Sequence, residues 1–304
     1  MATRDHPTRP QFVDWRKYLT PRHLDFVEYV SSVEYRKRCA ILRRESLPHF
    51  LYKFRSCVAS DDTARDRLRD VIVRSRLFLS SPVSFNDPYD TSAQVVLGGD
   101  ASEVRKTFDN ILKEQGLNWG DRRKRVGRFM SAGIESIGSH AQRMFESMAS
   151  AAGVYSFGGN PLNILMWAHY GENHRGLCFQ FDVAQDITTF ATALPVQYSE
   201  DYPILSWVGI NNDGESVTTV LLRKFKGWAY EEEHRIVIPE SAGKYLAFRP
   251  VALTGIIIGC RAAKDTVECL NDLLAERSAA GLPLLKTYRA SKHSSKYRLI
   301  LKRE

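Results

Sequence analysis

Apolar residues recur every three to four positions in several stretches of the chain, a spacing typical of helices with one buried face. In the last stretch Val267, Leu270 and Leu273 fall on one face, and Gly281 follows as a residue type that commonly ends a helix. The predicted helices lie at 21–44, in a segment that starts at Asp61, Asp62 or Thr63 and carries Leu68, Val71 and Ile72, within about 99–150, and at 161–170, 215–224 and 262–280.

Short apolar runs bounded by turn-forming residues predict strands between these helices. One run ends at Ser81-Pro82 and is followed by Asn86-Asp87-Pro88, a sequence whose side chains bond nearby backbone in turns. The uneven alternation of strands and helices favours an α+β fold over a doubly wound parallel sheet. The predicted strands lie at 51–54, 77–80, 153–157, 177–181, 196–198, 235–238, 255–258 and 297–301.

The same pattern divides the chain into an extension and one main domain. Residues 1–20 contain prolines and many charges, which predicts an arm on which the fold does not depend. We assign 1–48 to a basic arm with a helical extension, and 49–304 to a single α+β domain of catalytic type with a helical insertion at about 99–150. The sequence shows no repeats, no heptads, no P-loop and no glycine-rich dinucleotide turn.

Composition indicates a soluble protein of the cytoplasm. With 304 residues, 43% of them hydrophobic, the chain can bury a large core. No apolar run reaches the roughly 18 residues that a membrane span requires, and the first residues lack the apolar stretch of a secretory signal. No membrane partner is therefore expected. The five cysteines have no zinc-binding spacing, so reduced thiols are expected.

Charge adds a preference about the partner. The chain has 43 lysines and arginines against 35 aspartates and glutamates, a formal net charge of +8. This balance favours an anionic or phosphate-bearing partner without identifying one.

The acidic run Glu231-Glu232-Glu233 is the first candidate site, because the apolar residues 236–238 that follow it predict a buried strand. If that strand begins near Glu231, then Glu231 and Glu233 share one face and Glu232 takes the other. Two carboxylates at the entrance of a strand can form a charged site. The alternative is a solvated turn whose acids pair with Arg223, Lys224, Lys226 and Arg235.

Aromatic and histidine side chains gather in a second candidate segment, 166–176. Trp167, His169, Tyr170 and His174 together offer stacking surfaces and hydrogen-bonding groups that suit the rings of a nucleotide. Equally, Trp167 and Tyr170 are three residues apart and could cover the core from one helix face. The two histidines lack an evident third ligand, so no metal site is predicted.

The predicted strand Tyr52-Lys53-Phe54-Arg55 is the third candidate. Alternation along a strand places Lys53 and Arg55 on one face and Tyr52 and Phe54 on the other. Two cations on one face can hold a diphosphate, or they can face solvent at a sheet edge.

Five ordered motifs together resemble an uncharacterised bacterial family, the domain-of-unknown-function family numbered 2971. The resemblance runs from about residue 50 to about residue 260, and the family carries no established activity. The motifs are Leu51-Tyr52-Lys53-Phe54-Arg55, Ser80-Ser81-Pro82-x-x-Phe85-Asn86-Asp87-Pro88, Tyr155-Ser156-Phe157, Met166-Trp167-x-His169-Tyr170-x-x-x-His174-x-Gly176 and Trp228-x-Tyr230-Glu231-x-Glu233-x-Arg235.

The order and placement of these motifs are also similar, more distantly, to ADP-ribosyltransferases, especially the DNA-modifying toxins. In those enzymes an early strand carries a basic residue or histidine, a middle strand carries serine or aromatic residues, and a late strand begins with the catalytic glutamate. Lys53 or Arg55, Ser156 with Phe157, and Glu233 hold the matching places. The resemblance implies a split β-sheet core, and NAD as the substrate.

Other details of the sequence agree with that resemblance in one motif and depart from it in two. The pair Glu231-x-Glu233 resembles the E-x-E of many such transferases, in which the second glutamate is catalytic. The first-strand residue is Lys53 rather than arginine or histidine, and Ser156-Phe157-Gly158 departs from the usual S-T-S. These departures leave the pose of NAD open.

The resemblance implies a role for each site residue. Glu233 would stabilise the cation that forms when the nicotinamide bond breaks, and Glu231 would orient or deprotonate the acceptor. Lys53 or Arg55 would hold the adenosine or diphosphate end, while Tyr170, Trp167 or Phe157 would stack on nicotinamide. The full predicted cofactor-binding set is Tyr52, Lys53, Arg55, Ser156, Phe157, Trp167, His169 and Tyr170.

The acceptor and the biological setting are less defined. A nucleic-acid or protein acceptor, in a bacterial toxin or phage-defence setting, is the expectation. One rival is a binding module for nucleotides or nucleic acid without reaction, with phosphate contacts from 36–44 and 122–125. The other is a metal-dependent nuclease, with carboxylates that could hold magnesium at Asp87, Asp90, Glu231 and Glu233.

Overall fold

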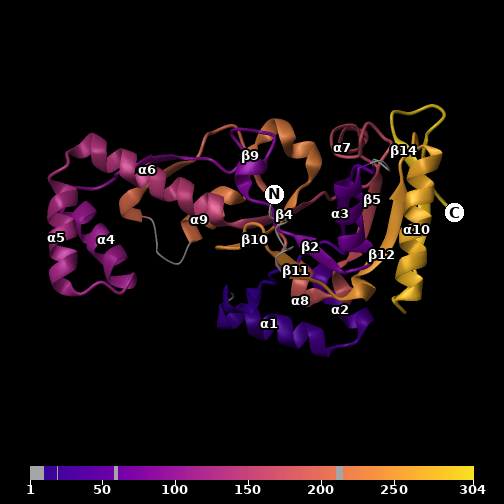
Figure 1. Ribbon diagram of the computed structural model, residues 1–304, viewed down its shortest axis with the longest axis horizontal. Coiled ribbons are helices and arrows are strands. Elements are labelled where there is room, and N and C mark those ends of the chain that lie inside the picture. Colours follow the sequence, from indigo (N-terminus) through magenta and orange to yellow (C-terminus); the bar gives the residue numbers. More distant parts are fainter. Residues whose placement is uncertain (1–9, 19, 58–60, 210–214) are drawn as a thin grey trace, which may run out of the picture.

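The computed structural model describes residues 10–18, 20–57, 61–209 and 215–304, and it contains helices and several small sheets (Figure 1). No helix among the described residues is long and apolar enough to cross a membrane. The helices are α1 (Pro21–Ser32), α2 (Tyr35–Arg44), α3 (Asp62–Ile72), α4 (Ala101–Glu114), α5 (Trp119–Met130), α6 (Ile134–Ala151), α7 (Ile164–His169), α8 (Ile187–Phe190), α9 (Glu215–Leu221) and α10 (Lys264–Ala279).

Two larger sheets organise the strands. A five-stranded sheet has the order β1-β5-β12-β13-β14, and a three-stranded sheet has the order β4-β10-β6. Three two-stranded sheets, β11-β2, β3-β8 and β7-β9, complete the described strands. Their bounds are β1 (Phe50–Arg55), β2 (Arg76–Phe78), β3 (Gln94–Val96), β4 (Gly153–Phe157), β5 (Leu177–Asp182), β6 (Leu194–Pro195), β7 (Gln197–Ser199), β8 (Ile204–Ser206), β9 (Arg223–Phe225), β10 (His234–Ile238), β11 (Tyr245–Ala247), β12 (Leu253–Ile258), β13 (Lys286–Lys292) and β14 (Leu299–Arg303).

The mixed content of helices and strands in separate sheets confirms the predicted α+β class. Strand β1 links the two larger sheets, because it pairs with β5 along its length and also meets the end of β4. The backbone of Tyr52 exchanges two hydrogen bonds with that of Gly158, at 3.0 and 2.8 Å. The sheets meet at this point, and a pocket lies here.

The main core fills the space between the sheets and the N-terminal and C-terminal helices. Apolar faces of α1, α2, α3 and α10 pack there against β1, β5 and β12, and residues of β4 and β10 join the same cluster. The predicted helical extension at 21–44 is therefore two short helices that cover the core. Residues Gln11 and Val13 also exchange backbone hydrogen bonds with Tyr245, so this part of the predicted arm is docked on the fold.

The predicted helical insertion forms a second core. Helix α4 begins at a capping box in which Asp100 and Glu103 bond each other's backbone, the arrangement that stabilises a helix start. Apolar residues of α4, α5 and α6 pack with Trp207 and with Val220 of α9. The insertion extends to one end of the molecule, and α6 leads directly into β4 (Figure 1).

One boundary differs from its prediction in a way that matters for the site. The predicted helix at 215–224 ends at Leu221, because residues Arg223–Phe225 pair in parallel with Gln197–Ser199 as β9 and β7. Lys224 consequently sits on a strand. The partner strand β7 is distant in sequence from β9, so helical periodicity alone placed the end of the predicted helix too late.

Candidate functional site

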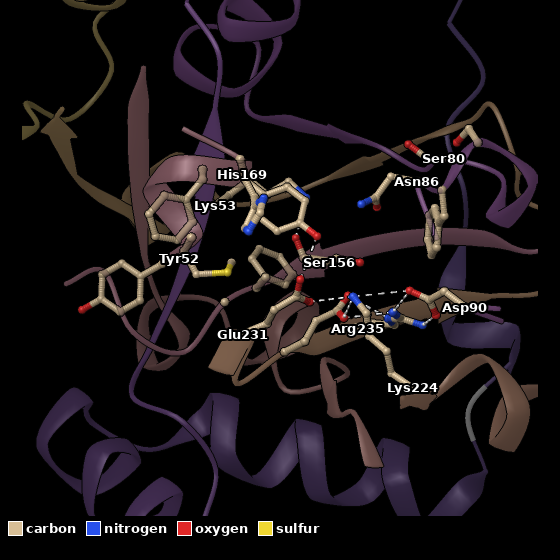
Figure 2. A pocket seen from close by; sticks show the side chains of 18 residues that line it. Tyr52, Lys53, Ser80, Asn86, Asp90, Ser156, His169, Lys224, Glu231 and Arg235 are labelled. Atoms are coloured by element: carbon tan, nitrogen blue, oxygen red, sulfur yellow. Dashed lines mark hydrogen bonds and ion pairs between the residues drawn. The ribbon is translucent and has the colours of Figure 1, made fainter. Parts of the chain in front are cut away.

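A pocket of about 450 Å³ opens where β1, β4, α7 and the segment before β10 converge (Figure 2). Most of the predicted site residues line it, whereas Arg55 and Trp167 do not. The lining residues that the sequence predicted are Tyr52, Lys53, Ser156, Phe157, His169, Tyr170, Glu231 and Glu233.

Glu231 and Glu233 reach the pocket by a different route from the predicted one. The segment Lys226–Glu231 is a 3-10 helix, and β10 starts only at His234, so the alternation of a strand does not explain their placement. Glu232 between them has a left-handed backbone with φ of 47° and caps the end of this 3-10 helix. As a result, Glu231 and Glu233 are buried and Glu232 is exposed.

Arg235 holds Glu233 and Asp90 together. Its guanidinium donates to both oxygens of Glu233, at 2.8 and 2.9 Å, and to both oxygens of Asp90, at 2.9 and 2.7 Å. A further hydrogen bond of 2.7 Å goes to the backbone oxygen of Leu221. Arg235 is only 1% exposed, so these forked contacts replace the water that the guanidinium gave up.

Lys224 is the second cation of the cluster. Its Nζ lies 2.6 Å from Glu231, 3.2 Å from Glu233 and 3.4 Å from Asp90. The ammonium therefore sits among all three carboxylates at the side of the pocket (Figure 2). Glu231 and Glu233 do pair with Lys224 and Arg235, as the solvated-turn interpretation expected, but they do so in the interior and line a pocket.

Three carboxylates and two cations leave this cluster with one excess negative charge when all five groups are ionised. Asp90, Glu231, Glu233, Lys224 and Arg235 are each 8% exposed or less, so solvent screens their interactions weakly. A site with this imbalance favours a positive charge on whatever enters the pocket beside it.

The two glutamates differ in their acidity. Burial raises the pKa of Glu231 above its ordinary value, although Lys224 opposes this shift. Burial also acts on Glu233, yet Arg235 and Lys224 outweigh it and lower the pKa of Glu233 to about 2. Glu233, whose pKa is lowered, can serve as a permanent anion, and Glu231, whose pKa is raised, can serve as a proton acceptor.

Tyr170 connects α7 to the acidic cluster. Its hydroxyl donates to Oε1 of Glu231 at 2.7 Å, and its pKa is raised by burial and by the charge of Glu231. This bond orients one oxygen of Glu231 while Lys224 holds the other. The neighbouring His169 lines the same pocket and lies near Trp228 and Tyr230, with ring centroids 6.2 and 6.3 Å apart.

Lys53 faces the pocket from β1. Its Nζ donates to the backbone oxygen of Ser156 at 2.6 Å and lies 4.7 Å from the ring centroid of Tyr155. Burial, reinforced by the nearby charge of Arg55, lowers the pKa of Lys53 to about 7. Ser156 itself is paired across the sheet with Arg235, so β4 brings Lys53 and the acidic cluster to one cavity.

Two aromatic residues predicted to stack on a ligand belong to the core instead. Trp167 is fully buried, packs edge-on against Phe54 and donates from its indole nitrogen to Pro161. Phe157 is 1% exposed and packs against Phe181 with ring centroids 5.6 Å apart. Trp167 therefore covers the core, as the alternative for Trp167 and Tyr170 expected, whereas Tyr170 lines the pocket.

The described carboxylates are not arranged as a metal centre. Among the residues that the structure describes, no group of three or more His, Cys, Asp or Glu side chains is arranged to hold a metal ion. Lys224 and Arg235 already form ion pairs with Asp90, Glu231 and Glu233, and Asp87 accepts a hydrogen bond of 2.7 Å from the indole of Trp228. The donor set predicted for a metal-dependent nuclease is thus engaged by other groups.

Sequence reasoning underrated Lys224 and Asp90. Lys224 was considered as a surface partner, and Asp90 as a metal ligand. Asp90 follows the Asn86-Asp87-Pro88 turn, and Lys224 lies seven residues before Glu231, so no local motif connects them. Only the pairing of β9 and the path of the loop after β2 bring them to the same place.

The comparisons with known proteins agree with part of the predicted resemblance. Residues 166–236 match the model of a family described as "Protein of unknown function (DUF2971)". This segment runs from α7 to β10 and includes Tyr170, Lys224 and both buried glutamates. Neither the curated proteins nor the solved structures gave a significant match to the chain.

Proposed function

We propose that this protein is an NAD-dependent ADP-ribosyltransferase that acts on a macromolecular acceptor. The proposal depends chiefly on one observation: a pocket beside which two buried glutamates have opposite pKa shifts within a cluster of net negative charge. The same pocket contains Ser156 and Lys53, the residues that the resemblance to these transferases selected.

The chemistry requires a fixed anion beside the reacting carbon. When the bond between the ribose C1′ and the nicotinamide nitrogen breaks, its electron pair leaves with nicotinamide and positive charge develops on C1′ and the ring oxygen. Glu233, with its pKa near 2, stays ionised and would stabilise that charge. At about 4 Å and an effective dielectric near 20 the interaction is roughly 4 kcal/mol, about a thousandfold in rate if felt only in the transition state.

Glu231 would complete the transfer. The acceptor nucleophile forms a bond to C1′ and must lose a proton, and a carboxylate with a raised pKa is a better base for that proton. Tyr170 and Lys224 would keep Glu231 oriented toward the acceptor. On this proposal, Glu233 retains its charge throughout and Glu231 changes protonation.

Binding of NAD would use the remaining pocket residues. Lys53 lies in the cavity with Tyr52, Ser156, His169 and Tyr170, so a partly protonated amine and several polar or aromatic groups face the substrate. Lys53 would contact the diphosphate or adenosine end. Arg55 lies outside the lining, which makes Lys53 the stronger of the two cations proposed for this role.

The proposal is tested by incubating the protein with NAD labelled on its ADP-ribose part and with separate DNA, RNA and protein pools. We expect label in one pool, a loss of labelling by at least a hundredfold (roughly 3 kcal/mol) in Glu233→Gln, and unchanged labelling in Glu232→Gln. Glu232→Gln is the matched control, because Glu232 is a glutamate next to Glu233 whose side chain is exposed and lies outside the pocket.

Folding must be checked in parallel, because Glu233 is the partner of a buried arginine. Circular dichroism and thermal melting report whether Glu233→Gln is folded, and Glu231→Gln carries the test if it is not. Labelling that persists in folded Glu233→Gln contradicts its assignment, and no NAD consumption by the unchanged protein contradicts the proposed activity. Activity that disappears with a chelator would instead favour metal-dependent chemistry.

The toxin or phage-defence setting belongs to the same proposal and is supported only by the resemblance. It predicts that expression of the unchanged protein in bacteria slows growth, whereas expression of Glu233→Gln does not.

A further inference from the structure

The helical insertion contains a second hollow, of about 340 Å³, between α4 and α5. We call it the insertion groove and define it by Ser102, Arg105, Lys106 and Asp109 of α4 with Trp119, Arg123 and Val126 of α5. Helices α4 and α5 lie at one end of the molecule, apart from β4 and β10 (Figure 1). Neither the pocket at Glu231 and Glu233 nor the proposed chemistry uses the insertion groove.

The charges of the insertion groove are predominantly positive and available. Within the described part of the chain, Arg105, Lys106 and Arg123 form no ion pair with a carboxylate. The one acid of the groove, Asp109, is held by Arg122 at 2.9 Å. Three cations therefore face the groove without compensation, and an anionic ligand would gain from all three.

Trp119 gives the groove an aromatic face. Its side chain is 65% exposed, unusually open for the largest apolar residue type. The guanidinium of Arg123 lies 5.3 Å from the ring centroid, close enough to hold the indole by a cation–π contact. A flat ring fixed beside a cation offers a stacking surface together with a charge.

We propose that the insertion groove binds single-stranded nucleic acid, with a base stacked on Trp119 and backbone phosphates on Arg105, Lys106 and Arg123. Exposed bases are available to stack in a single strand but not within a duplex, and this combination of aromatic ring and basic groove is how sequence-tolerant binding of single strands is achieved. An acidic protein segment would use the cations but has no systematic use for the ring. Single-stranded nucleic acid would also be the acceptor of the transfer, and this part of the inference rests on the proposed function. The binding itself does not.

The test measures fluorescence anisotropy of a short labelled single-stranded oligonucleotide with the full-length protein over a series of salt concentrations. Trp119→Ala should weaken binding roughly five- to a hundredfold, the cost of losing one stacked base, with little change in salt dependence. Arg105→Ala and Lys106→Ala should each reduce the slope of log affinity against log salt by roughly 0.7, the value for one lost phosphate contact on a single strand.

Arg143→Ala is the matched control, because Arg143 is an exposed arginine of the same insertion but lies on α6 outside the groove. It should leave affinity nearly unchanged. Equal binding by Trp119→Ala, or a loss in Arg143→Ala as large as in Arg105→Ala, overturns the inference. So does displacement of the oligonucleotide by polyglutamate at equal charge concentration, which would assign the groove to an acidic protein.

Measurement of NAD consumption separates this inference from the proposed function. Oligonucleotide binding that needs Trp119, without NAD consumption, upholds the groove and contradicts the transferase. NAD consumption that needs Glu233, without oligonucleotide binding, upholds the transferase and contradicts the groove.

Discussion

Glu231 and Glu233 are two residues apart, yet their neighbours give them opposite acidities. The two oxygens of Glu233 accept three hydrogen bonds from Arg235 and Lys224, whereas those of Glu231 accept one from the Lys224 ammonium and one from the Tyr170 hydroxyl. The number of cations on each carboxylate, and not its burial, separates the two. At the scale of single residues the site is therefore defined by what contacts each oxygen.

Lys53 supplies a prediction at the same scale, because its folded pKa of about 7 lies below the ordinary 10.5. Between these pH values the unfolded chain keeps the proton that the folded chain has released, so stability rises with pH. Below pH 7 both states are protonated and the cost of burying the charge is fully present. Lys53→Met should make the slope of stability against pH less positive across this window, by at most about 1.4 kcal/mol per pH unit.

Denaturant unfolding at several pH values between 7 and 10 measures this slope. Lys264→Met is the control, since the Lys264 side chain is 91% exposed on α10 and its removal should leave the slope as it is. Equal slopes for the unchanged protein and Lys53→Met would mean that Lys53 is protonated in the folded protein throughout.

At the scale of elements, the approach to β10 positions the glutamates. The 3-10 helix Lys226–Glu231 passes into the strand through one left-handed residue, Glu232. Residues of β10 then alternate between the two cores, because Ile236 and Ile238 pack in the main core and Val237 packs against that of the insertion. Because β10 is anchored in both cores, the backbone of the segment before it has few alternative positions.

The left-handed backbone at Glu232 leads to a second prediction. A β-branched side chain is strained in this conformation, so Glu232→Val should lower the free energy of unfolding by roughly 1–2 kcal/mol. It should also displace Glu231 and Glu233 and reduce NAD labelling. Glu232→Gly accepts the same backbone without strain and should keep both stability and labelling.

Denaturant unfolding and the labelling assay compare these two variants directly. If Glu232→Val were as stable and active as Glu232→Gly, the turn would tolerate another backbone conformation without moving the glutamates.

At the scale of the whole molecule, contacts connect the insertion with the site. Its core includes Trp207 and Leu221 from outside the insertion, and the backbone oxygen of Leu221 accepts from Arg235. The side chain of Gln142 on α6 also bonds the backbone of Val95 at 2.9 Å. These contacts run from the helices of the insertion to the buried charges.

Phe108 tests this connection. It is 8% exposed and stacks on Phe129 with ring centroids 3.8 Å apart. Phe108→Ala should destabilise the protein by roughly 3–5 kcal/mol, the usual effect of deleting a buried phenylalanine ring, and should lower the temperature of a single transition. Calorimetry that resolves two transitions, with only one shifted by the substitution, would show that the insertion unfolds separately.

Local patterns in the sequence determined much of the fold. Helical periodicity found helix α10 and the helical character of the insertion, which forms α4, α5 and α6. Of the three residues proposed for the start of α3, Asp61 is its N-cap. Strand β4 was predicted with its observed bounds. The short strands β3, β6, β8, β9 and β11 were missed, because pairing over two or three residues leaves no clear apolar pattern. The longer strand β13 was missed because its sequence is polar and basic.

The sequence by itself also singled out Glu231 and Glu233, since three adjacent acids before an apolar run are visible without a structure. It could not decide that the pair is buried, that Lys224 and Asp90 join it, or that Trp167 is removed from the pocket. Those outcomes depend on contacts between segments far apart in the chain, such as Asp90 with Arg235. Residue type and spacing determine what a segment can do, whereas burial and charge partners are properties of the folded neighbourhood.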